Sequence, residues 1–409
     1  MLYKQFGIRK LCAGSIAFVA LFLYMFNVLP IIGPEKVGTR EYLSVLASFF
    51  ILTIITKLPR MYFGLIIANW TQIFFSIITV LLNGTDDYWY IQFAIRNILY
   101  INGAVLIAYL MPKKWSIDTL LIMFIMAIVV NDLISLAGFI NSGIKSFILS
   151  IQDFTNMDKV ESTSEFGSRI IGIGRNNYFN GGVTNGMGII LAFYLMAQKR
   201  LHQFWGMALV LIMAVVGLFI ARTTIVGTAL GGIYYVLSVK NKTKILKGIF
   251  TITIITYMVV ASGLFEGMNT SHAFEIFEYY DKLDEIESLS KMESMYNRQI
   301  GIETFFIGDG LSKDGDSYYM HTDVGYMRNI FYFGIMGTLF GYLYYEYYIL
   351  KQLYLQDLES KLFVLTLAVY LLILNLKGLP DFNFFIFLFL AYYIRKNAIN
   401  KVSVLHSNR

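Results

Sequence analysis

The stretch IDTLLIMFIMAIVVNDLISLAGFI, residues 117–140, decides the fold. It contains two carboxylates and no basic residue, and roughly 20 apolar residues in a helix are enough to cross the hydrocarbon core of a bilayer. The apolar residues form a continuous run, whereas a membrane β-strand alternates at every second residue. This stretch therefore predicts a transmembrane helix.

Similar apolar runs recur along most of the chain. Of its 409 residues, 57% are hydrophobic and 15% are charged, a balance that would leave large apolar patches on a soluble protein. We predict an all-α, polytopic integral membrane protein with one membrane domain over residues 1–409 and about twelve helices, or ten to eleven if the short gaps at 222 and 378 do not separate helices. The other expected spans lie near residues 11–32, 41–56, 61–82, 90–111, 181–198, 204–221, 223–239, 245–264, 324–349, 361–377 and 379–394.

Basic residues predict the orientation of these helices. Of the 33 Lys and Arg residues, 19 lie in or directly beside every second loop, counting the segment before the first span and the segment after the last. Because Lys and Arg in short loops favour the cytoplasm, both termini are predicted to be cytoplasmic. The two longest polar loops, residues 141–181 and 265–323, are then extracytoplasmic. The first apolar run has no small-residue cleavage pattern, so we expect it to remain as a helix.

Several classes of protein and site are disfavoured. The net charge of +6 lies mostly in the cytoplasmic loops, which argues against nucleic-acid binding. Cys12 is the single cysteine, so no internal disulfide can form. The four histidines do not show metal-ligand spacing, and we expect neither a metal nor another cofactor.

The two long loops carry the residues of chemical interest. The first ends in GSRIIGIGRNNYFNGGVTNGMG, residues 167–188, whose glycines and asparagines predict a compact, turn-rich approach to the next helix. The second begins with helically spaced apolar and acidic residues from 271 to 306, which predict an amphipathic surface helix. It ends with His321 and Asp323, shortly before Arg328.

Two ionisable residues lie within apolar spans, Arg96 and Asp132. Each costs about 3 kcal/mol on insertion scales, so each needs a partner. Both lie roughly 10 Å from the outward ends of their spans at 1.5 Å rise per residue. We expect an ion pair between them, with a substrate contact for Arg96 as the alternative.

Arginines gather at the predicted outer interface. Bidentate guanidinium groups suit phosphate and pyrophosphate, so the arginines favour a lipid-linked phosphate, although snorkelling to headgroups would also place Arg222 and Arg328 there. His321 and Arg328 would share a helix face if the helix began at His321, with Gly325 leaving room for a ligand, whereas Asp323 could instead be an N-cap. The candidate phosphate-binding residues are Arg169, Arg175, Arg222, Arg298 and Arg328.

Three stretches resemble a known family. They are RIIGIGRNNYFNGGVTNGMGIILAF (169–193), ARTTIVGTALGGI (221–233), and NRQIGIETFFIGDG (297–310) followed by HTDVGYMRNIFYFGIMG (321–337). These motifs, in this order, resemble the bacterial Wzy-type polysaccharide polymerases and the related O-antigen ligases. At His321 the sequence His-Thr-Asp-Val-Gly-Tyr is more similar to the polymerases than to the ligases.

The resemblance implies a metal-independent, membrane-embedded glycosyltransferase of GT-C-like architecture in the bacterial cytoplasmic (inner) membrane. Such an enzyme transfers a growing glycan from undecaprenyl pyrophosphate to a lipid-linked repeat unit, with a chain-length regulator as an accessory partner. The resemblance implies that Arg169, Arg222 and Arg298 contact pyrophosphate and that His321 and Asp323 lie near the reacting sugar. Four loop aromatics could stack on sugars or instead anchor the protein at the membrane interface: Tyr178, Phe179, Tyr318 and Tyr319.

Some alternatives remain open. His321 or Asp323 could act as the general base, and histidine suits that role near neutral pH. An O-antigen ligase is the nearest alternative function, and a flippase or other transporter of the same lipid-linked unit is the alternative from another class.

Overall fold

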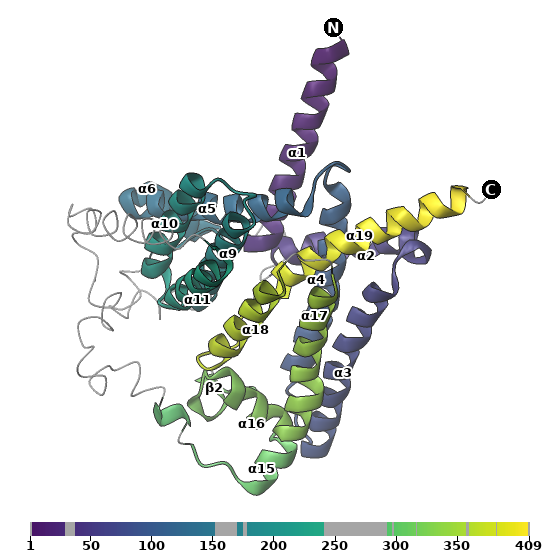
Figure 1. Cartoon of the computed structure of the whole chain (residues 1–409). Helices are drawn as coiled ribbons and strands as arrows, with labels where there is room; N and C mark the ends of the chain where they lie inside the picture. Colours follow the sequence, from purple (N-terminus) through teal and green to yellow (C-terminus); the bar gives the residue numbers. More distant parts are fainter. Residues whose placement is uncertain are drawn as a thin grey trace.

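The computed structural model describes residues 2–28, 37–151, 170–174, 178–240, 293–296, 298–315, 317–356, 360–381 and 383–407. Within these ranges the chain is almost entirely helical (Figure 1). The principal helices are α1 (Leu2–Phe26), α2 (Thr39–Ile54), α3 (Arg60–Asn83), α4 (Trp89–Leu110), α5 (Ile117–Ile140), α6 (Ser142–Ser150), α9 (Phe179–Ala197), α10 (Gln203–Ile220), α11 (Thr223–Ser238), α15 (Ile302–Ile307), α16 (Gly325–Gly337), α17 (Tyr344–Leu355), α18 (Lys361–Asn375) and α19 (Asn383–Ser407).

The all-α membrane class is confirmed. Among the described residues, five helices are long and apolar enough to cross a bilayer, and three shorter helices are also apolar. Arg222 and residues 376–381 lie between helices, as the two short gaps predicted. The expected span at 245–264 and the amphipathic helix of the second loop lie largely outside the described residues, so the total of twelve spans stays a prediction. The five long helices are Thr39–Lys57, Arg60–Asn83, Trp89–Leu110, Ile117–Ile140 and Gln203–Ile220.

One half of the bundle is built around α9. This helix packs against α5, α10 and α11, and the side chains from Gly181 to Met196 are all buried. Close approach of α9 and α11 depends on two glycines, because a Cβ atom on Gly227 would lie 2.2 Å from the Cα of Gly186. Small residues at such crossings are a common way for membrane helices to pack tightly.

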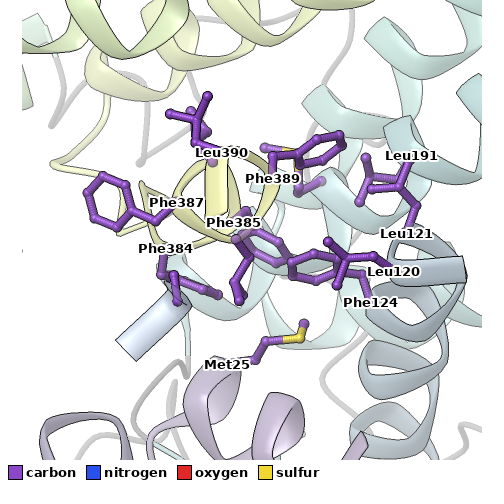
Figure 2. Packing of buried hydrophobic residues seen from close by; sticks show 14 of the residues in the cluster. Met25, Leu120, Leu121, Phe124, Leu191, Phe384, Phe385, Phe387, Phe389 and Leu390 are labelled. Atoms are coloured by element: carbon purple, nitrogen blue, oxygen red, sulfur yellow. The ribbon is translucent and has the colours of Figure 1, made fainter. Parts of the chain in front are cut away.

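Helix α19 connects this half to the other. Residues Phe384 to Leu390 of α19 are buried, and the ring of Phe385 lies 5.2 Å from that of Phe124 in α5 (Figure 2). The same helix packs along α4, while α3, α16 and α17 complete the second half. Both termini lie at one end of the molecule, and α15 lies at the other (Figure 1).

Near α15 the chain leaves helical structure and forms a small hairpin. Strands β1 (Lys313–Asp314) and β2 (Ser317–Tyr318) pair antiparallel, and the 3₁₀ turn η3 (Tyr319–His321) follows. Helix α16 is kinked at Gly334, which has φ 64° and ψ −178°. Asp309 and Gly310 donate backbone hydrogen bonds to the carbonyls of Phe331 and Tyr332 just before the kink. The glycine therefore allows α16 to hold the segment that leads into the hairpin.

Substitution of Gly334 by alanine should destabilise this region. Residues other than glycine rarely adopt its backbone angles, and a Cβ atom would lie 2.3 Å from the carbonyl oxygen of Phe306. We expect Gly334→Ala to lower the free energy of unfolding by about 2 kcal/mol, measured by equilibrium unfolding in mixed micelles. Gly232→Ala is the matched control, since its Cβ would meet open space within α11. Equal effects of the two substitutions would contradict this role of Gly334.

Candidate functional site

A cavity of about 830 Å³ lies between α4, α16, the hairpin and the α18–α19 connection. We refer to it as the α4–α16 cavity. It combines aromatic rings, three cations, a histidine and two carboxylates. Its lining residues are Trp89, Tyr90, Phe93, Arg96, Tyr100, Asn180, Met295, Lys313, Ser317, Tyr318, His321, Asp323, Arg328, Tyr342, Leu379, Pro380 and Asp381.

The α3–α4 loop fixes the hairpin over this cavity. Asp87 Oδ2 accepts hydrogen bonds from both the backbone N and the Oγ of Ser312, each at 2.6 Å. Its other oxygen, Oδ1, accepts from the backbone N of Trp89, and its carbonyl accepts from the hydroxyl of Tyr332 in α16. One aspartate therefore joins the hairpin, α4 and α16, which all contribute lining residues.

Arg328 is the most deeply buried charge that lines the cavity, with 9% of its surface exposed. Its guanidinium carbon lies 3.9 Å from the ring centroid of Tyr318 and 5.3 Å from that of Trp89. Its Nε has no hydrogen-bond partner, and no carboxylate within the described residues forms an ion pair with it. Burial in the cavity wall rules out snorkelling as the explanation for Arg328, and the cation is available to an anionic ligand.

His321 and Asp323 lie in the linker before α16. The condition under which His321 and Arg328 would share a helix face is not met, because α16 begins at Gly325 and His321 has φ 51°. Asp323 is not an N-cap either, since Val324 occupies that position without a side-chain cap. Both side chains are exposed and line the α4–α16 cavity, so the linker, not a helix face, brings them near Arg328.

Gly325 does not make room for a ligand, contrary to our expectation. A Cβ atom there would lie 2.6 Å from the carbonyl oxygen of Gly378 and 2.8 Å from the side chain of Asn375. The glycine instead allows the start of α16 to pack closely against the α18–α19 connection.

The cavity environment raises the pKa of Asp323 above its ordinary value of 3.8. The main cause is partial desolvation by the surrounding protein, even though water still reaches the carboxylate through the cavity. Its own backbone N–H and the positive charges of Lys377 and Arg328 act in the opposite direction. A carboxylate with a raised pKa is a better proton acceptor.

This shift predicts a pH-dependent difference in stability. The folded protein holds the Asp323 proton more tightly than the unfolded chain, so the stability contribution of this residue is lost as pH rises through its folded-state pKa. We expect Asp323→Asn to be more stable than wild type at neutral pH, with the difference vanishing below about pH 3.8. Unfolding in mixed micelles across this pH range tests the expectation. A pH-independent difference would contradict it.

The predicted Arg96–Asp132 ion pair is wrong. Asp132 is fully buried in α5 and accepts a 3.2 Å hydrogen bond from Asn185 Nδ2 in α9. Arg96 is half-buried and lines the α4–α16 cavity. Helix α5 packs mainly against α6, α9 and α10. Asp132 therefore lies against α9, whereas Arg96 of α4 lies beside the cavity. The alternative, a ligand contact for Arg96, fits this position.

Of the other predicted site residues, only some line the α4–α16 cavity. Arg222 precedes α11 and is half-buried, and Arg298 is exposed, but neither lines the cavity. Tyr318 lines it, whereas the hydroxyl of Tyr319 donates to Asp309 Oδ2 at 3.0 Å. Tyr178 and Phe179 begin α9 next to the lining residue Asn180 without lining the cavity themselves. Arg169 and Arg175 lie outside the described residues.

Sequence reasoning missed Lys313, Asn180 and Asp381. Asp381 follows Pro380 at the end of an apolar run, and an isolated carboxylate in that position was the available signal. Its partner is Arg40 at the start of α2, with 2.9 Å between Arg40 Nη1 and Asp381 Oδ2. Arg40 and Asp381 are 341 residues apart in the sequence.

Among the described residues, no group of three His, Cys, Asp or Glu side chains is arranged as a metal site. The donors that line the cavity are instead guanidinium, ammonium, imidazole and amide groups, which suit an anionic and hydroxyl-rich ligand.

Comparison with known proteins found no matching family model, no matching curated protein and no matching solved structure.

Proposed function

We propose that this chain is a polysaccharide polymerase that transfers a growing glycan from undecaprenyl pyrophosphate to a sugar hydroxyl of a lipid-linked repeat unit. The observation that carries the proposal is Arg328, a buried cation that faces the α4–α16 cavity and forms no ion pair with a carboxylate among the described residues. Burying a charge without a direct ion-pair partner is costly. A pyrophosphate group would supply the missing partner.

The remaining charges of the cavity support an anionic ligand. Arg96 and Lys313 add to the positive charge of Arg328. Of the two carboxylates, Asp381 is already paired with Arg40, which leaves Asp323 as the opposing charge. The excess of positive charge therefore favours phosphate or pyrophosphate in this space.

Aromatic rings in the same cavity support a sugar attached to that anion. Trp89, Tyr90, Phe93 and Tyr318 all line it, and the planar faces of such rings pack against the apolar faces of sugars. Trp89 and Tyr318 also border the guanidinium of Arg328. A sugar that packs on these rings would have its pyrophosphate at Arg328.

The reaction that we propose is a direct glycosyl transfer. The bond between the anomeric carbon of the donor and its pyrophosphate oxygen breaks, and the bonding electrons leave with pyrophosphate, which Arg328 neutralises. An acceptor hydroxyl oxygen bonds to the anomeric carbon, and its proton passes to His321 or Asp323. Undecaprenyl pyrophosphate and a glycan extended by one transfer are the products.

The proposal places the cavity at the outer face of a bacterial cytoplasmic membrane. It includes twelve spans, cytoplasmic termini and a GT-C-like, membrane-embedded glycosyltransferase architecture. The positive charge of the alternate loops and the location of both termini at one end of the molecule support this orientation (Figure 1).

Lipid binding tests the proposal directly. The full chain in nanodiscs should bind undecaprenyl pyrophosphate more tightly than undecaprenyl phosphate, and undecaprenol least, measured by lipid titration against intrinsic fluorescence. This order is expected because charge, not the shared prenyl chain, distinguishes the three lipids. Equal affinity for all three would overturn the proposal.

A further inference from the structure

A second polar group lines the α4–α16 cavity away from Arg328. It consists of Asp381 in the α18–α19 connection and Asn180 in the first turn of α9. The length of the cavity can be estimated along α4. Trp89 of this helix lies beside Arg328, and Tyr100 lies beside Arg40. These two α4 residues are about 16 Å apart at 1.5 Å per residue. The cavity is therefore long enough for more than one chemical group of a ligand.

Arg40 holds the Asp381 carboxylate in place. The arginine is 1% exposed, and its Nε and Nη2 donate to the carbonyls of Tyr24 and Met25, each at 2.7 Å. The rings of Tyr100 and Phe384 border its guanidinium at 5.0 and 4.2 Å. Asp381, in contrast, keeps a third of its side-chain surface exposed. A rigid, buried cation thus presents a carboxylate to the cavity.

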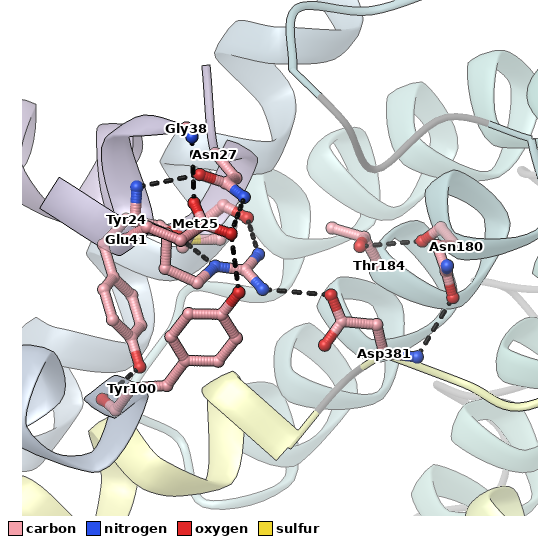
Figure 3. A network of polar contacts seen from close by, with 10 residues as sticks. Tyr24, Met25, Asn27, Gly38, Glu41, Tyr100, Asn180, Thr184 and Asp381 are labelled. Carbon is pink, nitrogen blue, oxygen red and sulfur yellow. Dashed lines mark hydrogen bonds and ion pairs between the residues drawn. The ribbon is translucent and has the colours of Figure 1, made fainter. Parts of the chain in front are cut away.

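Each side chain of the pair has one unused hydrogen-bonding group. Asp381 Oδ2 accepts from Arg40, while its Oδ1 has no hydrogen bond within the described residues. Asn180 Oδ1 accepts from the backbone N of Asp381 at 3.0 Å, which leaves its Nδ2 as a donor (Figure 3). The wall therefore offers one acceptor and one donor from adjoining side chains.

We propose that Asp381 and Asn180 form a subsite for the hydroxyl groups of a neutral sugar in the lipid-linked glycan. One hydroxyl would donate to Asp381 Oδ1 and a neighbouring hydroxyl would accept from Asn180 Nδ2, with Tyr100 beside them. The ion pair with Arg40 reduces the attraction of Asp381 for cations, which favours a neutral donor. This subsite rests on the proposed function and adds to it a residue pair that selects the glycan.

The test compares Asp381→Asn with the double variant Arg40→Gln/Asp381→Asn. The double variant replaces the ion pair by two neutral amides and leaves no buried charge without its partner, so it protects the fold if Asp381→Asn alone is unstable. Asp86→Asn is the control, because this carboxylate is exposed and does not line the cavity. Glycan ladders are measured in a strain lacking the gene, and undecaprenyl pyrophosphate binding is measured in nanodiscs.

We expect both Asp381 variants to lose long chains by about ten-fold or more, as for a lost hydrogen bond to a charged group, while they bind undecaprenyl pyrophosphate as wild type does. Wild-type ladders in Asp381→Asn would overturn the subsite. Restored ladders in the double variant would also overturn it, because Asp381 would then serve only as the partner of Arg40. Failure of the wild-type protein to prefer pyrophosphate would overturn the proposed function, and the subsite with it.

Discussion

Arg328→Gln is expected to weaken binding of undecaprenyl pyrophosphate by about 100-fold, the loss typical of a desolvated charge pair. Glutamine keeps the first part of the aliphatic side chain and an N–H donor group but removes the charge. Because Arg328 is buried against Tyr318 and Trp89, the charge acts where water screens it poorly. Titration of the variant in nanodiscs measures the effect.

The control for this prediction is Arg298→Gln. Arg298 is exposed and does not line the α4–α16 cavity, so its substitution should leave the affinity close to that of wild type. This contrast separates a local effect at Arg328 from a general loss of positive charge at the membrane surface. Similar losses in both variants would assign the binding to diffuse surface charge and not to the cavity.

Asp381→Leu is expected to lower the free energy of unfolding by about 3–5 kcal/mol, because it leaves the Arg40 guanidinium buried without its counter-charge. Arg40 would retain its hydrogen bonds to two backbone carbonyls, but these are neutral acceptors. Equilibrium unfolding in mixed micelles gives the measurement.

Asp381→Asn is the matched variant for this comparison. An amide oxygen can still accept from Arg40 Nη1, so the loss of stability should be smaller than for leucine. If the two variants are equally stable, the pair with Arg40 does not hold the α18–α19 connection to the start of α2.

The helices could be predicted from sequence because apolar runs long enough to cross a membrane are separated by charged or glycine-rich breaks. Helix α5 has the boundaries that its apolar run indicated, residues 117–140. The rotation of each helix could not be predicted. The polar residues of α4 do not fall on one side of the helix, and α5 is apolar over most of its surface, so no polar stripe identified the neighbour that Arg96 or Asp132 would face.

The part of the site that could be predicted lies within one short segment. Tyr318, His321, Asp323 and Arg328 are close in sequence, so their approach to one cavity required only a turn before α16. Asn180 and Asp381 reach the same cavity from distant helices. Their contact depends on how α9 packs beside the α18–α19 connection, which sequence reasoning from one chain does not reveal.

The glycan ladder of a strain lacking the gene, complemented with wild type or Arg328→Gln at equal protein level, tests the central claim most directly. We predict a ladder of chain lengths with wild type and single repeat units with the variant, since the buried cation would neutralise the leaving pyrophosphate. A full ladder with Arg328→Gln would contradict the assignment of Arg328 and the cavity. In the deletion strain, long chains stranded on the lipid carrier would indicate a ligase, and repeat units trapped at the cytoplasmic face would indicate a flippase.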